Sequence, residues 1–325
     1  MIDLRTEFGG LHLRNPIIIS SSGLTNTADK NERLEMAGAG AIVLKSLFEE
    51  QIMLKAQQSN EAAYYPEGGN FLTEHLNAQD LSEYLKLIQE SKKRCSIPII
   101  ASINCCSNKE WVEFARKVEL AGADAIELNI LSIQVSPYYE CGEFERQHIE
   151  ILKNVKSKVH IPVIIKLGIH LTNPVSLINK LRANGAEGIV LFNRLYQTDI
   201  DINKLEFTSG ELLSSASDLT SSLRWIGISS ATVTNIDYAA SGGVHSGEAA
   251  IKSILVGASA VEICSIVYKT GIQCIQPMLK SIEKWMTEKN YDNISQFKGL
   301  LRPKDVACAS AYERTQFLRY FSELD

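Results

Sequence analysis

The sequence contains no apolar run that approaches the ~18 residues needed to span a membrane. It also lacks a basic excess, because 33 Lys and Arg stand against 38 Asp and Glu, which gives a formal net charge of -5. Proteins that bind nucleic acid usually show the opposite balance. Only 20 Gly and 8 Pro occur among the 325 residues, far fewer than in low-complexity or collagen-like chains. These shortages predict a folded protein that binds neither a membrane nor nucleic acid.

Cysteine and histidine are few and scattered. The 7 Cys form no C-x-x-C pair, although Cys105 and Cys106 are adjacent, so a disulfide framework is not expected. The 6 His include no H-E-x-x-H motif, and we therefore predict no metal site. The opening residues, MIDLRTEFGG, lack the apolar segment of a secretory signal. Together with the unpaired cysteines, this indicates a cytoplasmic protein.

A weak internal repeat is the first sign of organisation. Each copy ends an amphipathic stretch, passes through a turn that contains Gly and Ala, and enters a short apolar run that finishes near a polar residue. This order is typical of a helix that closes on a C-terminal Gly and leads into a buried parallel strand. The copies are EMAGAGAIVLKS ending at Ser46, ELAGADAIELNI ending at Ile130, LRANGAEGIVLFN ending at Asn193 and ILVGASAVEICS ending at Ser265.

Four further apolar runs lie between these copies, which brings the predicted strands to eight. They are NPIIISSSG from Asn15, IPIIASIN from Ile97, IPVIIKLG from Ile161 and NIDYAASGGV from Asn235. Helical patterns separate many of the strands, as expected for successive βα units. These patterns cover residues 80–93, 109–120, 144–156, 174–183 and 246–255.

Eight βα units predict an α/β protein with a (β/α)8 TIM barrel, in a single domain that spans residues 1–325. The barrel needs ~250 residues, and the surplus is expected in two long connections and a helical extension from Gln276. The connections follow the second strand, at about residues 47–95, and the sixth strand, at about residues 194–234. A doubly wound open sheet is the alternative, but no dinucleotide-binding G-x-G-x-x-G motif supports it.

The predicted strands end in polar residues, and barrel enzymes carry their chemistry at these ends. Lys45 and Lys166 each close an aliphatic run, where an unpaired ammonium is costly, so each needs an anionic or electron-rich partner. One interpretation is a structural ion pair with a strand carboxylate such as Glu127 or Glu262. The other is a polar pocket for a planar, heteroatom-rich ligand. The strand-end residues are Ser20, Ser21, Ser22, Gly23, Lys45, Ser46, Ser102, Asn104, Glu127, Asn129, Lys166, Asn193, Gly242, Gly243, Cys264 and Ser265.

The segment SGGVHSGEAA places Gly242 and Gly243 at the end of the seventh strand, just before a helix. Backbone N–H groups of the loops after strands seven and eight commonly bind phosphate in this fold. The glycines alone would also suit a tight turn without a ligand. Their place on the seventh strand favours a phosphate site that Cys264 and Ser265 complete.

With these residues laid out, the sequence resembles the dihydroorotate dehydrogenase family, FMN-dependent barrel enzymes of pyrimidine biosynthesis, and most of all its soluble class 1 branch. The resemblance runs nearly end to end. It rests on LHLRNPIIISSSG at the start, AIVLKS at strand two, ELN at strand four, IKL at strand five, FN at strand six, SGGVHSG, and VGASAVEICS.

The resemblance implies an FMN oxidoreductase that oxidises dihydroorotate to orotate, with hydride transfer to flavin N5 and, as in class 1, a homodimer. Lys45 would lie near both FMN and substrate, Asn129 would contact both, and Asn193 would bind substrate. Lys166 would stabilise the flavin ring, because a buried ammonium offsets the negative charge of reduced flavin near N1 and O2. The residues implied to bind FMN are Ser21, Gly23, Lys45, Ser46, Asn104, Asn129, Lys166, Asn193, Gly242, Gly243, Cys264 and Ser265.

The sequence departs from the family after ELN, where a Ser or Cys base is followed by Pro-Asn. Here Ser132 takes the position of the base, and Ile133 and Gln134 replace the Pro-Asn pair. The candidate catalytic residues are therefore Ser132 and Lys45, with Cys141 as the alternative base. The family's Gly-Leu-Pro-Asn substrate loop is also missing, and EGGNF at residues 67–71 is only loosely similar.

Two other functions stay open. One is a diverged flavoprotein of the same family with another substrate or no catalysis. The other is a Schiff-base aldolase that uses Lys166 or Lys45 and binds a sugar phosphate at the glycine turn. The electron acceptor is also open among fumarate, NAD and a quinone. No membrane-binding extension precedes the barrel, which disfavours a quinone, and no Cys cluster could hold an iron-sulfur centre in this chain.

Overall fold

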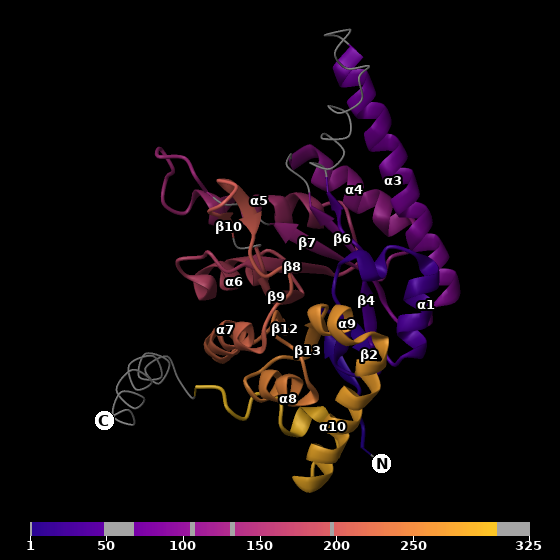
Figure 1. The fold of residues 1–325 in the computed structure, drawn as a ribbon, viewed down its shortest axis with the longest axis vertical. Helices are drawn as coiled ribbons and strands as arrows, with labels where there is room; N and C mark the ends of the chain where they lie inside the picture. The colour runs from indigo at the N-terminus through magenta and orange to yellow at the C-terminus, as the bar shows by residue number, and fades with distance from the viewer. Residues whose placement is uncertain (1, 49–67, 105–107, 131–133, 196–197, 304–325) are drawn as a thin grey trace.

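The computed structural model describes residues 2–48, 68–104, 108–130, 134–195 and 198–303. Eight parallel strands form its centre, and Figure 1 shows them surrounded by helices. The sheet closes on itself because the second of these strands along the chain pairs with the first strand on one side and with the third strand on the other. The strands are β3 (Ile17–Ile19), β4 (Ala41–Val43), β6 (Ile99–Asn104), β7 (Ala125–Ile130), β8 (Val163–Gly168), β9 (Gly188–Asn193), β12 (Asp237–Ser241) and β13 (Ala260–Ile263).

The spatial order of the strands is β4-β3-β13-β12-β9-β8-β7-β6, and the additional pairing of β4 with β6 closes the ring. This is the (β/α)8 barrel that the sequence predicts, and the open doubly wound sheet is wrong. Helices follow the strands around the outside. They are α1 (Ala28–Met36), α3 (Gly68–Arg94), α4 (Asn108–Leu120), α5 (Glu143–Lys156), α6 (Pro174–Ala183), α7 (Leu219–Thr232), α8 (Gly247–Leu255), α9 (Ser265–Thr270) and α10 (Ile275–Glu288).

The glycines of the four repeated segments close helices in the way that the sequence predicts. Gly38, Gly122, Gly185 and Gly257 follow α1, α4, α6 and α8, and each has a positive φ, between 94° and 118°. An L side chain is strained in this conformation, whereas glycine adopts it freely. Each repeat is therefore one connection from a helix to the next strand of the barrel.

The barrel interior has an apolar layer near the amino ends of the strands and a polar layer above it. A short hairpin of β1 (Thr6–Phe8) and β2 (Leu11–Leu13) places Phe8 and Leu11 in the apolar layer, next to Ile164 of β8. Side chains alternate along a strand, so the residue two positions beyond Ile164, Lys166, also points inward. The same step leads from Ala125 to Glu127 on β7, and both of these side chains are buried.

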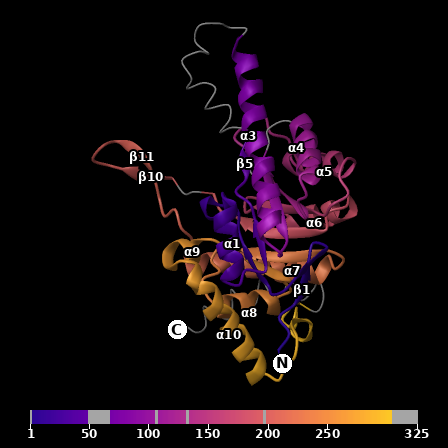
Figure 2. The same ribbon diagram turned by 90° about the vertical axis from the view of Figure 1, so that its right-hand side faces the viewer.

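Two stretches depart from the regular alternation. After β4 come β5 (Leu47–Phe48) and the long α3, which projects beyond the barrel (Figure 2). Between β9 and α7, a hairpin of β10 (Thr198–Asp201) and β11 (Glu206–Ser209) stands away from the body. Four short 3-10 helices complete the described secondary structure: η1 (Gly23–Thr25), η2 (Ala216–Asp218), η3 (Ile272–Cys274) and η4 (Ile294–Gln296).

α10 lies in the region where the sequence predicts a helical extension, and it packs on α8 outside the barrel. Its buried residues, Ile275, Met278, Leu279, Ile282 and Met286, recur every three or four positions and form one apolar face. Within the described residues, no helix is both long and apolar enough to cross a membrane. The organisation of residues 1–325 as one domain stays a prediction.

Candidate active site

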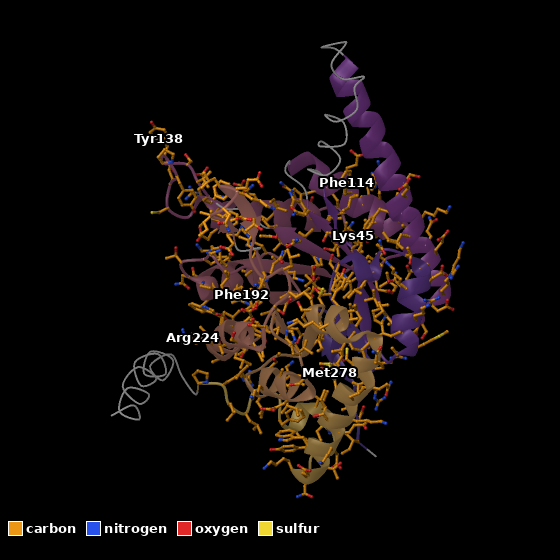
Figure 3. All side chains as sticks on the ribbon, in the orientation of Figure 1. Lys45, Phe114, Tyr138, Phe192, Arg224 and Met278 are labelled. Atoms are coloured by element: carbon orange, nitrogen blue, oxygen red, sulfur yellow. The ribbon has the colours of Figure 1, made fainter. Side chains whose placement is uncertain are left out.

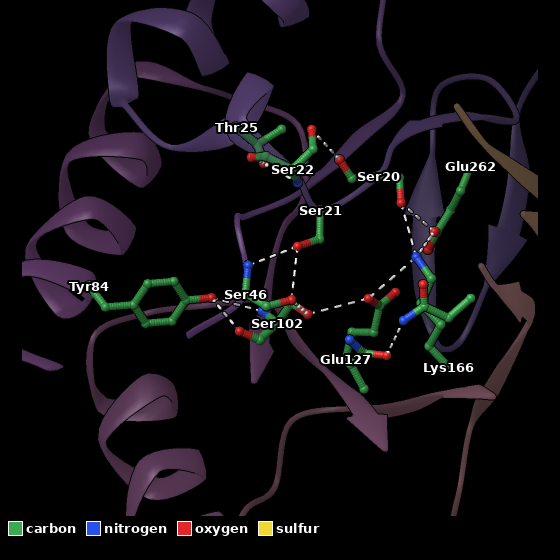
Figure 4. Close-up of polar contacts among 12 residues, drawn as sticks. Ser20, Ser21, Ser22, Thr25, Ser46, Tyr84, Ser102, Glu127, Lys166 and Glu262 are labelled. Atoms are coloured by element: carbon green, nitrogen blue, oxygen red, sulfur yellow. Dashed lines mark hydrogen bonds and ion pairs between the residues drawn. The ribbon is translucent and has the colours of Figure 1, made fainter. Parts of the chain in front are cut away.

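Lys166 of β8 lies inside the barrel in a buried cluster of charged and hydroxyl side chains (Figure 4). Its Nζ lies 2.5 Å from Oε2 of Glu262 on β13 and donates a hydrogen bond of 2.9 Å to Oγ of Ser20, which follows β3. Ser20 in turn donates to the same Glu262 oxygen, at 2.8 Å. Oε1 of Glu127, on β7, is 3.8 Å from the ammonium. The structure therefore contains the predicted ion pair of Lys166 with a strand carboxylate, and the pocket for a planar ligand stays a prediction.

The two carboxyl groups of this cluster titrate differently. Burial raises the pKa of Glu127 well above its ordinary value, and the neighbouring Glu262 charge raises it further. Burial also acts against ionisation of Glu262, but the attraction of Lys166 together with hydrogen bonds to Glu127, Lys166 and Ser20 outweighs it and lowers the pKa of that carboxyl. For Lys166, burial opposes the charge, but the two carboxyl groups outweigh it and raise the pKa of the ammonium. These opposite shifts favour the proton on Glu127 over Glu262 and keep the charge on Lys166.

Three serine hydroxyls continue from this cluster toward the strand ends. Ser102 Oγ lies 3.4 Å from Oε1 of Glu127 and 2.7 Å from Oγ of Ser46. Oγ of Ser46 is 2.9 Å from that of Ser21, which also accepts the backbone N–H of Ser46 at 2.8 Å. Tyr84 of α3 holds the backbone of Ser102 by accepting its N–H and donating to its C=O, at 2.8 and 2.9 Å.

An amide pair lies at the carboxyl ends of two strands that flank a third. Asn193, the last residue of β9, donates from Nδ2 to Oδ1 of Asn129 on β7, at 2.7 Å. β8 runs between these two strands and carries Lys166 in register with Asn129. The remaining amide donors and acceptors suit a planar ligand with carbonyl and N–H groups at its edge.

The turn after β12 contains the two glycines at which the sequence predicts a phosphate site. Gly242 and Gly243 have φ angles of 85° and 76°, and a Cβ on Gly243 would stand 2.3 Å from the backbone nitrogen of Leu219. The Gly243 N–H donates to Oγ of Ser214, at 3.3 Å. Backbone N–H groups and hydroxyls that gather at a glycine turn can bind a phosphate.

Ser214 returns to this turn from the long connection after β9. Its N–H donates to Oγ of Ser265 at 2.9 Å, and its carbonyl accepts from Nζ of Lys269 at 2.8 Å. Its hydroxyl lies 3.0 Å from Nε2 of His245. Burial lowers the pKa of His245 and the Lys269 charge lowers it further, so the imidazole is neutral at pH 7. The ammonium and the hydroxyls are the donor types that a phosphate monoester requires.

Most of the predicted site residues lie at this end of the barrel, but with different exposure. Lys45 is exposed, and Ser132 and Ile133 lie outside the described residues. Cys141 is exposed in the loop that carries Tyr138, which projects from the molecule in Figure 3. The buried members are Ser46, Asn104, Asn129, Lys166 and Gly243, and the partly buried ones are Ser21, Gly23, Asn193, Gly242, Cys264 and Ser265.

Sequence reasoning missed Ser214 and Lys269, and it placed Glu262 only as a possible ion-pair partner. Ser214 belongs to a connection without periodic pattern, so no signal in the sequence points to its contact with the glycine turn. Glu262 could have been assigned to the site, because it interrupts an apolar run two residues before Cys264, a spacing that places both on one face of an extended chain.

A polar cavity of about 420 Å³ lies at the opposite end of the barrel, around the amino ends of β9 and β12. Three of its four charged residues are already in ion pairs: Lys298 with Asp237, at 3.3 Å, and Glu187 with Lys156, at 2.7 Å. We therefore place the candidate site at the carboxyl ends, where the polar layer lies. Among the described residues, no group of three or more His, Cys, Asp or Glu side chains could hold a metal ion.

The fold and the polar strand ends define a parallel barrel with an enzyme-type site. A family model for dihydroorotate dehydrogenase matches residues 3–286. The chain therefore belongs to the dihydroorotate dehydrogenase family.

Curated relatives agree with this assignment along most of their length. The dihydroorotate dehydrogenase B (NAD(+)), catalytic subunit, of Methanocella arvoryzae is 31% identical over 291 residues, which cover 87% of this chain and 92% of the relative. The protein of the same name from Methanocaldococcus jannaschii is 28% identical over 299 residues, covering 88% and 94%. That of Thermoplasma volcanium is 28% identical over 313 residues, covering 92% and 99%.

Proposed function

We propose that this protein is an FMN-dependent oxidoreductase that oxidises dihydroorotate to orotate. The observation that carries the proposal is the gathering, at one end of the barrel, of a buried ammonium, an amide pair and a glycine turn with hydroxyl and ammonium donors. The donor set fits each part of FMN: Lys166 for the electron-rich edge of the ring, Asn129 for its carbonyl and N–H groups, and the Gly242–Gly243 turn for the phosphate.

Bound FMN would supply a hydride acceptor at N5. The chain's own residues would bind and orient. Backbone N–H groups at Gly242 and Gly243, with Ser265 and Lys269 close by, would hold the phosphate. Asn129 and Asn193 would fix the plane of the substrate by paired hydrogen bonds. Holding the reacting groups in one geometry in this way removes much of the entropic barrier to reaction.

Ser132 is the proposed base that removes the substrate proton, and Lys45 is proposed to lie near both reactants. A serine is a weak base at its free pKa and needs a neighbouring acceptor, whereas a cysteine supplies a thiolate under milder conditions. Cys141 is exposed in the same loop region and is the alternative base. The replacement of Pro-Asn by Ile133 and Gln134 supports a shifted substrate preference, so a diverged flavoprotein is the second candidate.

The Schiff-base alternative has less support. A Schiff base needs a neutral lysine as nucleophile, and Lys166 has its pKa raised because the carboxyl groups of Glu127 and Glu262 outweigh burial. The relatives are named catalytic subunits with NAD(+) as acceptor, which supports NAD and a partner chain here. A homodimer and a cytoplasmic location complete the proposal.

The deciding experiment is anaerobic addition of dihydroorotate to the purified protein. We expect a yellow protein that releases FMN on denaturation and whose flavin absorbance is bleached by dihydroorotate. A yellow protein that dihydroorotate does not bleach would transfer the proposal to the diverged flavoprotein. A colourless protein that borohydride traps covalently with a sugar phosphate would replace both with the aldolase.

A further inference from the structure

The hydroxyls of Ser102, Ser46 and Ser21 form an unbroken line from the buried Glu127 to the carboxyl end of the barrel. We propose that Glu127 carries a transferable proton and that these three hydroxyls conduct it between the barrel interior and the site. The proposal rests on the proposed function, because it takes a flavin bound at the carboxyl end of the barrel as the group that the proton reaches.

The distances between neighbouring oxygen atoms and the burial of the three serines show that the line leads from the barrel interior outward. Ser102 is fully buried and Ser46 is 6% exposed, whereas Ser21 is partly exposed. The successive gaps are 3.4 Å from Glu127 Oε1 to Ser102, 2.7 Å from Ser102 to Ser46 and 2.9 Å from Ser46 to Ser21. Figure 4 shows the line running from the carboxyl cluster toward the segment after β3. A hydroxyl both donates and accepts, so each can receive a proton on one side and release one on the other.

The transfer is a proton relay without a change of oxidation state. The O–H bond of Glu127 breaks as a new one forms at Ser102, whose own proton passes to Ser46. The proton of Ser46 passes to Ser21, and that of Ser21 bonds to a basic nitrogen or oxygen of the ligand. Glu127 is left as a carboxylate, and uptake of a proton from solvent along the same line restores it.

Lys166 and Glu262 explain why a proton is kept at Glu127. Glu262 already neutralises Lys166, so a second carboxylate would leave an unpaired negative charge in the barrel interior. The Oε1 atom of Glu262 is buried and has no hydrogen-bond partner among the described residues, so it can accept a hydrogen bond from a protonated Glu127. The other titratable groups that face the cluster are neutral: burial raises the pKa of both the Tyr84 phenol and the Cys264 thiol.

The line is also held in place by contacts that do not use the protons of its hydroxyls. Tyr84 occupies only the backbone groups of Ser102. The backbone N–H of Ser46 donates to Ser21 Oγ, which fixes that hydroxyl next to the Ser46 side chain. A contact network of this kind keeps the oxygen atoms within hydrogen-bond distance without using up their protons.

The test is infrared spectroscopy of the full chain, with the Glu127→Gln variant as reference. The difference spectrum should contain the carbonyl band of a neutral carboxylic acid at pH 7. After rapid mixing with D2O this band shifts as its proton exchanges. We expect Ser46→Ala to slow the exchange at least tenfold, because the line is cut in the middle. Ser253→Ala removes another buried serine, bonded to Ala249 outside the line, and should exchange at the native rate.

Ser21→Ala is the second variant, because its partly exposed site tolerates the change even if Ser46→Ala does not fold. It should slow exchange in the same way. Absence of the carboxylic-acid band, or exchange at the native rate in both serine variants, would overturn the proposal. The exchange needs no substrate turnover, so a protein that fails to oxidise dihydroorotate can still confirm the relay, and an active enzyme can still refute it.

Discussion

Lys166 and Glu262 form an ion pair of 2.5 Å in the interior of the barrel, between β8 and β13. These strands are not neighbours, so the pair crosses the barrel. The consequence is that the charge of the lysine is already compensated by the chain. A flavin that meets Lys166 therefore meets an ion pair, and its reduced form is stabilised by the part of the ammonium field that Glu262 leaves uncompensated.

Replacing Lys166 by Ala should lower both the FMN content and the reduction potential of bound FMN. Loss of the ammonium leaves Glu262 buried without its partner, at a cost of about 3–5 kcal/mol in the free energy of unfolding. Denaturant unfolding and flavin potentiometry measure the two effects. Lys92→Ala, which breaks the Lys92–Asp124 pair of 2.7 Å outside the site, is the control and should leave FMN content unchanged. Full FMN content with an unchanged potential in Lys166→Ala would refute the role of this lysine.

Glu127→Gln should change the pH dependence of stability. The pKa of Glu127 is raised in the folded protein, so unfolding above about pH 4.5, the ordinary value, releases a proton. The native free energy of unfolding then falls with rising pH by about 1.4 kcal/mol per unit on account of this group, until its raised pKa is reached. Urea unfolding at several pH values should show the variant gaining stability relative to the native protein as pH rises. If the difference in free energy of unfolding between the variant and the native protein did not change with pH, Glu127 would be ionised in the folded protein.

Gly243→Ala should destabilise the protein and weaken FMN binding. The residue has a φ of 76°, and its Cβ would collide with the backbone of Leu219. Strain and overpacking together should cost about 2–5 kcal/mol. Gly122→Ala is the matched control, since its φ is 95° but no atom lies within 4 Å of its Cβ. Only the backbone strain of about 1–3 kcal/mol should appear there, with FMN affinity unchanged. Equal losses of stability in the two variants would contradict the close approach of Gly243 to the backbone of Leu219.

Ser132→Ala and Cys141→Ala should differ in their rates of flavin reduction by dihydroorotate under argon. If Ser132 is the base, the rate of flavin reduction in its variant should fall by about 10²–10⁴-fold, the usual contribution of a positioned acid or base. Cys141→Ala should then keep the native rate. Fast reduction in Ser132→Ala would remove that residue from the role, and a loss confined to Cys141→Ala would assign the role to the cysteine.

The sequence alone determined the architecture, because the barrel is built from local signals repeated along the chain. Apolar runs of strand length, amphipathic helices and a glycine such as Gly38 or Gly257 after the helix each depend on neighbours a few residues away. The alternation along each strand also places a residue such as Lys166 at the inner face and at the carboxyl end.

Tertiary structure decided what those inward side chains contact. Glu262 and Lys166 are 96 residues apart in the chain and touch only because the barrel closes. The same closure sets which carboxyl is ionised, because the pKa of each depends on burial and on charges from other strands. Ser214 reaches the glycine turn from a connection without periodic pattern, which no local rule positions. Local propensity can place a residue on a face of its own element, but its partners across the interior depend on the packing of the whole chain.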